Sequence, residues 1–305
     1  MSRQALKPRI SLGSWAFSFG PFANNPWSFE AFCKYTADAG YDGVEINGFR
    51  PHPHPADYES RAKRMGLKRY LDDLGLGISG YAPDFHAVPP AVASPDSYIA
   101  VVQSCLDFMA DLDIKILRVD TVSPPVALDP VQYERRFEQL VTTWRKAAAL
   151  CAQGDVTVVW EYEPGFWLNK PSEVLRLVRQ VEHPAFKILF DTSHSYMGAV
   201  VGARHTGKPE VLAGGLAQYA QMLAPHIGHV HLMDSDGSLH ENETSTHTPF
   251  GQGHIDFPEV LQALHPALQN LQWWCLDFCF CPTTQRDALS AVSYVRALAQ
   301  GIQIS

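Results

Sequence analysis

The sequence predicts an α/β fold, a single (β/α)₈ barrel of the TIM-barrel type spanning residues 1–305. Eight short apolar runs alternate with longer amphipathic segments, and strands that alternate with helices form parallel sheets. The length of 305 residues suits one such barrel, which needs roughly 250, and no linker or shift in composition divides the chain. An open, doubly wound sheet is the alternative, but no G-x-G-x-x-G motif follows the first apolar run.

Each expected strand is a short apolar run that stops abruptly at polar residues. Residues 187–190 are the clearest case, because the run ends in Asp191, two hydroxyl residues and His194. A strand that is buried on both faces has a continuous apolar run rather than an alternating pattern. The expected strands are residues 10–14, 41–46, 78–82, 115–119, 156–160, 187–190, 227–232 and 271–276.

The expected helices are bounded by start and stop signals. Ser94 and Pro95 form a typical helix start, with serine as the cap and proline in the first turn. Gly40 and Gly75 end the first two helices. The expected helices are residues 28–39, 56–74, 94–112, 129–151, 171–181, 216–223, 258–268 and 284–299, and residues 198–215 and 235–253 are expected to be loops.

Potential metal ligands follow the last four expected strands. In a (β/α)₈ barrel the active site lies at the carboxyl ends of the strands, and neighbouring strands are about 5 Å apart. The residues that can therefore converge on one ion are Glu161, Asp191, His231 and Asp277. Three carboxylates and one imidazole suit Mn²⁺, Mg²⁺ or Co²⁺ better than a structural zinc site. Each residue also has a plainer interpretation. Asp191 would cap the next helix and leave His194 unused, and Glu161 would pair with Arg118. His231 would be a core histidine, and Asp277 would cap the last helix.

Further polar and aromatic residues are expected around the same end of the barrel. Glu163 and His194 follow two of the candidate ligands closely enough to contact a substrate or to support those ligands. A proline-rich loop after the second strand is stiff and places His52 and His54 over the barrel mouth, or else carries them as exposed loop residues. Aromatic residues expected at the mouth, or for several of them in the core, are Trp15, Phe17, Trp27, Tyr81, Phe85, Trp167 and Phe280. The candidate substrate-binding residues are His54, Arg118, Glu163, Trp15, Asp234 and His247.

The composition argues against several classes of protein. The formal net charge is −8, whereas proteins that bind phosphate backbones carry basic patches. No apolar run approaches the roughly 20 residues of a membrane span, and no signal peptide is visible. Six cysteines are too few for a disulfide framework in a chain of 305 residues. We expect a cytoplasmic protein with reduced thiols and with no nucleic-acid or membrane partner.

Four motifs together resemble the xylose isomerase-like TIM-barrel superfamily. They are Val-Trp-Glu161-Tyr-Glu163-Pro, Phe-Asp191-Thr-Ser-His194, His-Val-His231-Leu-Met-Asp234-Ser-Asp236-Gly237 and Pro249-Phe-Gly251-Gln-Gly253-His-Ile-Asp256-Phe257. This superfamily includes sugar phosphate isomerases and epimerases, ketose 3-epimerases, inosose dehydratases, the large subunits of C-glycoside deglycosidases and the endonuclease IV repair enzymes. The resemblance covers nearly the whole chain, and its motifs are specific to the superfamily but not to one reaction.

The resemblance implies a role for each candidate residue. The four strand-end residues take the metal-ligand positions, with Mn²⁺ as the expected ion and Mg²⁺, Co²⁺ or Zn²⁺ as alternatives. Glu161 and Asp277 would remove and return a proton beside a sugar carbonyl, and His194 would orient a substrate hydroxyl. Two positions depart from the ketose 3-epimerases: Asp277 stands where they commonly carry glutamate, and residues 233–237 lack their arginine.

The implied activity is that of a divalent-metal-dependent sugar isomerase or epimerase. A divalent ion would act as a Lewis acid and stabilise an enediolate, while neighbouring carboxylates transfer the proton. The alternative is a lyase that uses the same enolate for β-elimination, as in an inosose dehydratase or a 3-oxo-glycoside or C-glycoside deglycosidase. The expected substrate is a small sugar or keto-sugar without phosphate, because no cluster of lysine and arginine stands near the last strand.

Two other hypotheses remain. An endonuclease IV-like nuclease would use extra histidine ligands, for which His52, His54, His86 and His247 are candidates, but the acidic composition argues against it. The intact ligand set argues against a non-catalytic sugar-binding relative. The family also suggests a homo-oligomer, and a deglycosidase-like protein would have a small partner subunit.

Overall fold

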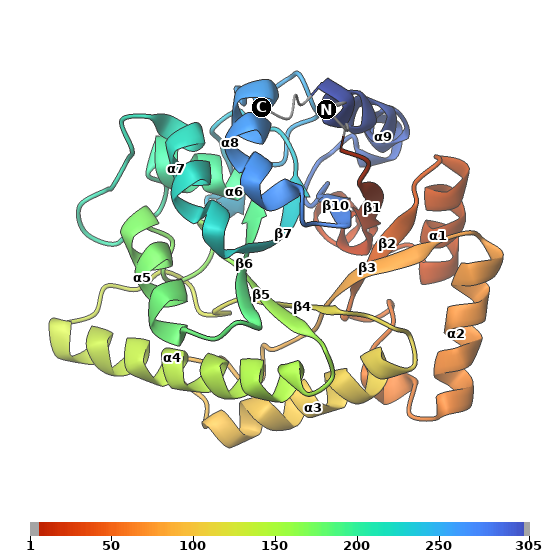
Figure 1. Cartoon of the computed structure of the whole chain (residues 1–305), viewed down its shortest axis with the longest axis horizontal. Coiled ribbons are helices and arrows are strands. Elements are labelled where there is room, and N and C mark those ends of the chain that lie inside the picture. The colour runs from red at the N-terminus through yellow and green to blue at the C-terminus, as the bar shows by residue number, and fades with distance from the viewer. Residues whose placement is uncertain (1–5, 302–305) are drawn as a thin grey trace, which may run out of the picture.

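The strands form one closed parallel barrel, as predicted. The computed structural model describes residues 6–301. Around the barrel the strands follow the order β1 (Arg9–Gly13), β10 (Trp273–Leu276), β7 (Ile227–Leu232), β6 (Phe186–Asp191), β5 (Thr157–Glu161), β4 (Ile116–Val119), β3 (Gly77–Ala82) and β2 (Gly43–Asn47), which pairs with β1 again. Helices surround this barrel (Figure 1). Helices α3 and α4, at the bottom of this view, lie side by side. The α/β TIM-barrel prediction is therefore confirmed.

The helices that follow the barrel strands begin where the capping residues predict. Ser28, Ser94 and Asp129 each accept a hydrogen bond from a backbone N–H of the first turn that they cap. The helices are α1 (Phe29–Asp38), α2 (Arg61–Asp73), α3 (Pro95–Ala110), α4 (Pro130–Ala152), α5 (Pro171–Val181), α7 (Gly215–Leu223), α8 (Phe257–Leu268) and α9 (Thr284–Gly301). Within residues 6–301, no helix is both long and apolar enough to cross a bilayer.

Three short elements depart from the sequence-based expectation. Helix α2 begins at Arg61 rather than near residue 56, because Ser60 is its cap and Pro55–Asp57 form a separate turn. The short helix α6 (Thr192–Tyr196), which is absent from the expected helices, starts directly after β6, and Asp191 caps it as the plainer interpretation expects. The expected loop 235–253 contains a hairpin of β8 (Leu239–His240) and β9 (Thr244–Ser245). Elements of two residues are too short to produce a recognisable periodicity.

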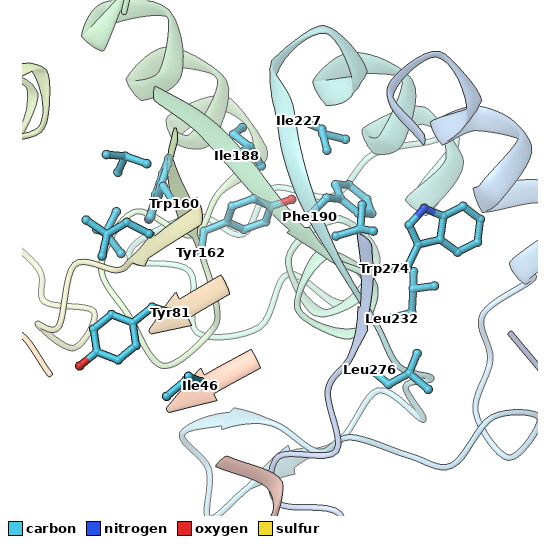
Figure 2. Packing of buried hydrophobic residues seen from close by; sticks show 14 of the residues in the cluster. Ile46, Tyr81, Trp160, Tyr162, Ile188, Phe190, Ile227, Leu232, Trp274 and Leu276 are labelled. Atoms are coloured by element: carbon cyan, nitrogen blue, oxygen red, sulfur yellow. The ribbon is translucent and has the colours of Figure 1, made fainter. Parts of the chain in front are cut away.

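The barrel strands separate polar and apolar side chains by alternation. Successive side chains of a strand point to opposite faces, so Phe190 and Asp191 lie on different sides of β6. Figure 2 shows the outward layer, in which Trp160, Leu232 and Trp274 belong to one continuous buried cluster with residues of the surrounding helices. The inward positions at the carboxyl ends of the same strands are left for polar groups.

Asp234 organises the long loop after β7. Its carboxylate accepts hydrogen bonds from the backbone N–H groups of Gly251, Gly253 and Ile255 at 3.0–3.1 Å, and also from that of Ser235. Asp234 is 1% exposed. This geometry corrects the expectation that Asp234 binds substrate, because both of its oxygens are occupied by the loop that it folds.

We predict that Asp234→Ala destabilises the protein through this loop. Four backbone donors would lose a charged acceptor, so the free energy of unfolding should fall by about 2 kcal/mol or more. Urea unfolding measures the loss, and hydrogen exchange at Gly251 and Gly253 locates it. The matched control is Asp236→Ala, which removes an exposed carboxylate that serves only Ser238. Equal stability of the two variants would contradict this role.

Candidate active site

The four candidate ligands come together at the carboxyl ends of β5, β6, β7 and β10. Glu161, Asp191, His231 and Asp277 each offer a ligand atom, and these atoms all lie within 4.8 Å of one another. Strand register explains this convergence. Asp191 pairs directly with His231, which pairs in turn with Cys275, so Asp277 lies two residues further on and on the same face. The four side chains are between 0% and 4% exposed.

The atoms at the centre of this cluster lack hydrogen-bond partners. Glu161 Oε1, Asp191 Oδ2 and His231 Nδ1 are buried and unpartnered. His231 Nδ1 lies 2.8 Å from Glu161 Oε1 and 3.6 Å from Asp277 Oδ2. Buried polar atoms are normally paired, because an unpaired one costs roughly 1–3 kcal/mol. Three carboxylates and one imidazole directed at one point fit a divalent cation with a preference for oxygen ligands.

The electrostatics of the cluster also fit a cation. Burial raises the pKa of Asp191 to about 7, and the charges of Asp277 and Glu161 add to this effect. Burial would likewise raise the pKa of Glu161, but Arg118 and His231 hold it well below its usual range. Asp191 is therefore the ligand carboxyl that is partly protonated near neutral pH, because it is buried beside like charges. Because metal ligands must be deprotonated, binding of a cation would release this proton.

Arg118 holds one oxygen of Glu161 and leaves the other free. Its guanidinium donates to Glu161 Oε2 through Nε at 2.6 Å and contacts Asp120 Oδ2 through Nη1 at 2.5 Å. The salt-bridge interpretation of Glu161 thus applies to Oε2, while Oε1 faces the ligand cluster. A charge-assisted contact of this kind fixes the carboxylate in one orientation.

Asp277 is held in a similar way, from the side of β1. Its Oδ1 accepts hydrogen bonds from Trp15 Nε1 at 2.6 Å and from the backbone N–H of Cys279 at 2.7 Å. Its Oδ2 remains on the side of His231. Asp277 does not cap the last helix, which begins at Thr284.

The β8–β9 hairpin positions two further polar residues of the site. Ser245 Oγ lies 2.8 Å from His194 Nδ1, and Thr244 donates its hydroxyl to Glu163. Burial lowers the pKa of His194 to about 3, with His247 contributing, so its ring is neutral. Burial raises the pKa of Glu163 to about 8, and the charge of Glu161 adds to this shift. His194 Nε2 and Glu163 Oε2 lie 3.8 Å apart.

His247 reaches the site from the loop after β7. Its Nδ1 lies 2.8 Å from the carbonyl oxygen of Cys279, which fixes the ring. Its Nε2 is buried without a hydrogen-bond partner and lies 3.9 Å from Asp191 Oδ1. This nitrogen is therefore free to contact a substrate oxygen or a ligand of the cluster.

A cavity of about 570 Å³ opens above the cluster. Glu161 and Asp277 line it, whereas Asp191 and His231 do not and lie beneath its surface. Its other polar lining includes Arg118, Glu163, His194 and His247, and its aromatic lining is Trp15, Phe19, Phe49, Phe166 and Phe280. Arg118 is the one arginine or lysine in this lining, within the described part of the chain. A cavity with a few convergent polar groups and apolar walls is typical of a small-molecule site.

Several aromatic residues expected at the mouth lie in the core. Phe17 packs against Trp27 with ring centroids 4.5 Å apart, and Phe85 stacks on Tyr98 at 4.6 Å. Tyr81 and Trp167 likewise belong to the hydrophobic cluster. Of the expected aromatic set, Trp15 and Phe280 line the cavity. The presence of an aromatic residue near a strand end does not reveal which face it occupies.

The expectation for His54 is also corrected. Its Nδ1 accepts a hydrogen bond from the backbone N–H of Ala56 at 3.2 Å, and the residue does not line the cavity. His52 is buried instead, between Ser14 Oγ and the carbonyl oxygen of Trp27. The proline-rich loop therefore turns its imidazoles away from the ligand cluster.

A second cavity, of about 690 Å³, lies at the opposite end of the barrel. It is lined by residues at the amino ends of the strands, such as Arg9, Gly77 and Trp273. Its two lysines already face carboxylates, Lys68 at 3.6 Å from Asp72 and Lys115 at 3.6 Å from Asp113. Catalytic residues of such barrels lie at the carboxyl ends of the strands, so the smaller cavity is the candidate site.

Comparison with known proteins agrees with this architecture. The family model described as "Xylose isomerase-like TIM barrel" matches residues 33–271. Fructoselysine 3-epimerase of Escherichia coli O157:H7 is 21% identical over 232 residues, covering 74% of this chain and 77% of the relative. Inosose dehydratase of Geobacillus thermodenitrificans (strain NG80-2) is 22% identical over 288 residues, covering 85% and 86%. A solved structure of D-psicose 3-epimerase in the presence of D-fructose superimposes with a TM-score of 0.72 at 16% identity, covering 96% of this chain and all of that one (100%).

We predict that Mn²⁺ raises the melting temperature of the wild-type protein and that Asp191→Asn removes this effect. Asparagine keeps an oxygen that can accept the N–H of His194 but loses the charge that faces the cation. Changing a residue that only supports a metal ligand lowers affinity by roughly 10–100-fold. Because Asp191 is itself a proposed ligand, we expect the affinity for Mn²⁺ to fall by at least roughly 100-fold. Calorimetric titration measures it, with Asp236→Asn as the control. Unchanged affinity would remove Asp191 from the ligand set.

Proposed function

The chain belongs to the xylose isomerase-like TIM barrel family, and from this membership and the geometry of its strand ends we propose that it is a divalent-metal-dependent sugar isomerase or epimerase. The observation that carries this proposal is the convergence of Glu161, Asp191, His231 and Asp277 beneath a cavity of about 570 Å³. The relatives named as a 3-epimerase and as a dehydratase support chemistry beside the carbonyl group of a sugar or keto-sugar.

The ligand set would hold Mn²⁺, with Mg²⁺, Co²⁺ and Zn²⁺ as alternatives. When bound, such an ion supplies Lewis acidity that makes a hydrogen beside a carbonyl group more acidic. Asp191 and His231 lie under the cavity surface and serve only as ligands in this proposal. Glu161 and Asp277 also line the cavity, so they can exchange protons with a substrate.

Two carboxylates that reach the cavity from different strands suit epimerisation. Glu161 ends β5 and Asp277 follows β10, and β6 and β7 lie between these strands in the sheet. One carboxylate would take the proton from one face of the substrate, and the other would return a proton to the opposite face. His194, a neutral imidazole fixed by Ser245, would orient a substrate hydroxyl.

Elimination is the second candidate function. The same proton abstraction followed by loss of a hydroxyl group gives a dehydratase, and the inosose dehydratase relatives support this reaction. An elimination needs a proton donor for the leaving oxygen. Glu163 lines the cavity, and its burial favours the protonated form at neutral pH. We propose Glu163 as that donor if the chain is a lyase.

The nuclease hypothesis receives support from one of the four histidines that suggested it. His247 belongs to a group able to hold a metal, with Asp191, His194 and Asp277, whereas among residues 6–301 no such group includes His52, His54 or His86. The formal net charge of −8 also opposes the binding of a phosphate backbone. We therefore propose a small-molecule substrate.

We predict that Glu161→Gln abolishes proton exchange while leaving the fold intact. The amide keeps a partner for Arg118 but cannot accept a proton, and loss of a general base costs roughly 10²–10⁴-fold in rate. The assay is NMR of keto-sugars, inososes and 3-oxo-glucosides incubated with Mn²⁺-loaded protein in D₂O. Deuterium beside the carbonyl group reports enolisation, and the product distinguishes an epimer from an elimination product. The control is Glu259→Gln on the exposed first turn of α8. Full exchange by Glu161→Gln would remove Glu161 from proton transfer.

We predict a preference for unphosphorylated substrates. Arg118 is already engaged by Glu161 and Asp120, so no free arginine or lysine of the cavity lining can meet a phosphate group. An unpaired charge in a buried site is costly, and about 1.4 kcal/mol corresponds to a tenfold change. The ratio kcat/KM should therefore be at least about tenfold lower for a sugar phosphate than for the parent sugar. A preference for the phosphate would contradict the charge balance described above.

A further inference from the structure

Glu45 is a buried carboxylate inside the barrel, directly behind His231. It lies in the middle of β2 rather than at the end of a strand, and it is 0% exposed. Its Oε1 lies 3.2 Å from His231 Nε2, and its Oε2 lies 2.7 Å from His229 Nε2. The hydroxyl of Ser79 donates a third, longer hydrogen bond to Oε2, at 3.3 Å. One carboxylate thus joins two histidines of β7 to strands β2 and β3.

The strands provide room for this carboxylate. The pairing of β2 with β3 shifts register between Val44 and Glu45, and a shift of this kind turns a side chain to a new direction. Gly80 faces Glu45 across this pair, and a Cβ atom at Gly80 would lie 3.2 Å from the carboxyl carbon of Glu45. A larger residue would therefore crowd the glutamate.

Stability alone does not account for a charged residue at this position. The interior of such a barrel is usually filled by branched apolar side chains. Replacing a buried ion pair by apolar residues of similar volume is often neutral or stabilising, because charges lose their hydration on burial. The arrangement of Glu45, His229 and Ser79 therefore suggests a function that depends on the group it contacts, His231.

The contact determines which nitrogen of His231 is available to a cation. The hydrogen bond from His231 to Glu45 places a proton on Nε2, because a carboxylate can only accept. Nδ1 also lies near a carboxylate, 2.8 Å from Glu161 Oε1, but makes no hydrogen bond to it. The other nitrogen, Nδ1, is unpartnered and faces Glu161 and Asp277. An imidazole that donates to a carboxylate is fixed in orientation and becomes a stronger metal ligand.

We propose that Glu45 is a positioning residue for the metal centre, acting through His231; this inference rests on the proposed function. Glu45 fixes the ring and the tautomer of His231 and increases its affinity for a divalent cation. The hydrogen bond from His229 Nε2, at 2.7 Å, holds the carboxylate in the orientation that this task requires.

The test compares Mn²⁺ binding by wild-type protein, Glu45→Gln and Glu45→Asp. A glutamine side chain has no charge and a single acceptor oxygen for two histidines, so Mn²⁺ affinity should fall roughly 10–100-fold, and aspartate should restore part of it. The visible spectrum of the Co²⁺-loaded protein should change in Glu45→Gln, because it reports the ligand field directly. The matched control is Ser79→Ala, which removes a hydrogen bond to Glu45 but leaves both histidine contacts, and it should bind Mn²⁺ like the wild type.

The outcomes separate this inference from the proposed function. Equal Mn²⁺ affinity and identical Co²⁺ spectra in wild type and Glu45→Gln would overturn the role of Glu45 and leave the metal site standing. A wild-type protein that binds no divalent cation would overturn the proposed function itself. An equal loss of affinity in Ser79→Ala and Glu45→Gln would also overturn the inference, since it would indicate general disturbance of the core.

A second measurement covers the case in which Glu45→Gln does not fold. In ¹⁵N-histidine-labelled wild-type protein loaded with Zn²⁺, NMR should find the proton of His231 on Nε2 and none on Nδ1. The signals are assigned by their absence from His229→Gln and His231→Gln proteins. A proton on Nδ1 of His231 would overturn the proposal, because that nitrogen could not then bind a cation.

Discussion

The alternation of side chains along eight closed strands is the constraint on which the site depends. Asp191 and His231 face inward only because Phe190 and Leu232 face outward into the layer shared with the helices. Slipping one strand by a single residue would exchange the two layers, placing a carboxylate among apolar side chains and an aromatic ring in the ligand cluster. The large outward core therefore fixes the register of the strands, and the register brings the ligands of four strands to one level.

The sequence predicts features that depend on short-range signals. The apolar runs locate the strands, and the polar residue that ends each run locates the candidate ligands, because the carboxyl ends of parallel strands meet at one rim. Features that depend on distant contacts are not predictable in this way. Phe17 and Tyr81 resemble Trp15 in the sequence, yet only Trp15 lines the cavity, and the difference arises from the way the helices cover the barrel. The direction of His54 depends similarly on a local turn.

The strand-seven motif combines two functions that the sequence does not separate. His231 belongs to the ligand cluster, whereas Asp234, three residues later, folds the loop that follows. That loop carries the hairpin residue Ser245 and also His247, and both reach the site from above. Residues far from the ligands in the sequence therefore help to shape the site.

The choice between epimerisation and elimination depends on the walls of the cavity rather than on the ligand cluster. Both reactions begin with removal of the same proton, so both can use the same carboxylates. They differ in the second proton transfer. In epimerisation a second carboxylate returns a proton to the carbon that lost one, whereas in elimination an acid protonates the oxygen that leaves the neighbouring carbon. Asp277 is one methylene shorter than glutamate and is bound by Trp15 and Cys279, so its reach toward the substrate is limited. Glu163, in contrast, lies beside His194 and accepts a hydrogen bond from Thr244 of the hairpin. In the proposed reactions, the position of the substrate relative to Asp277 and Glu163 would decide which of the two acids exchanges the second proton.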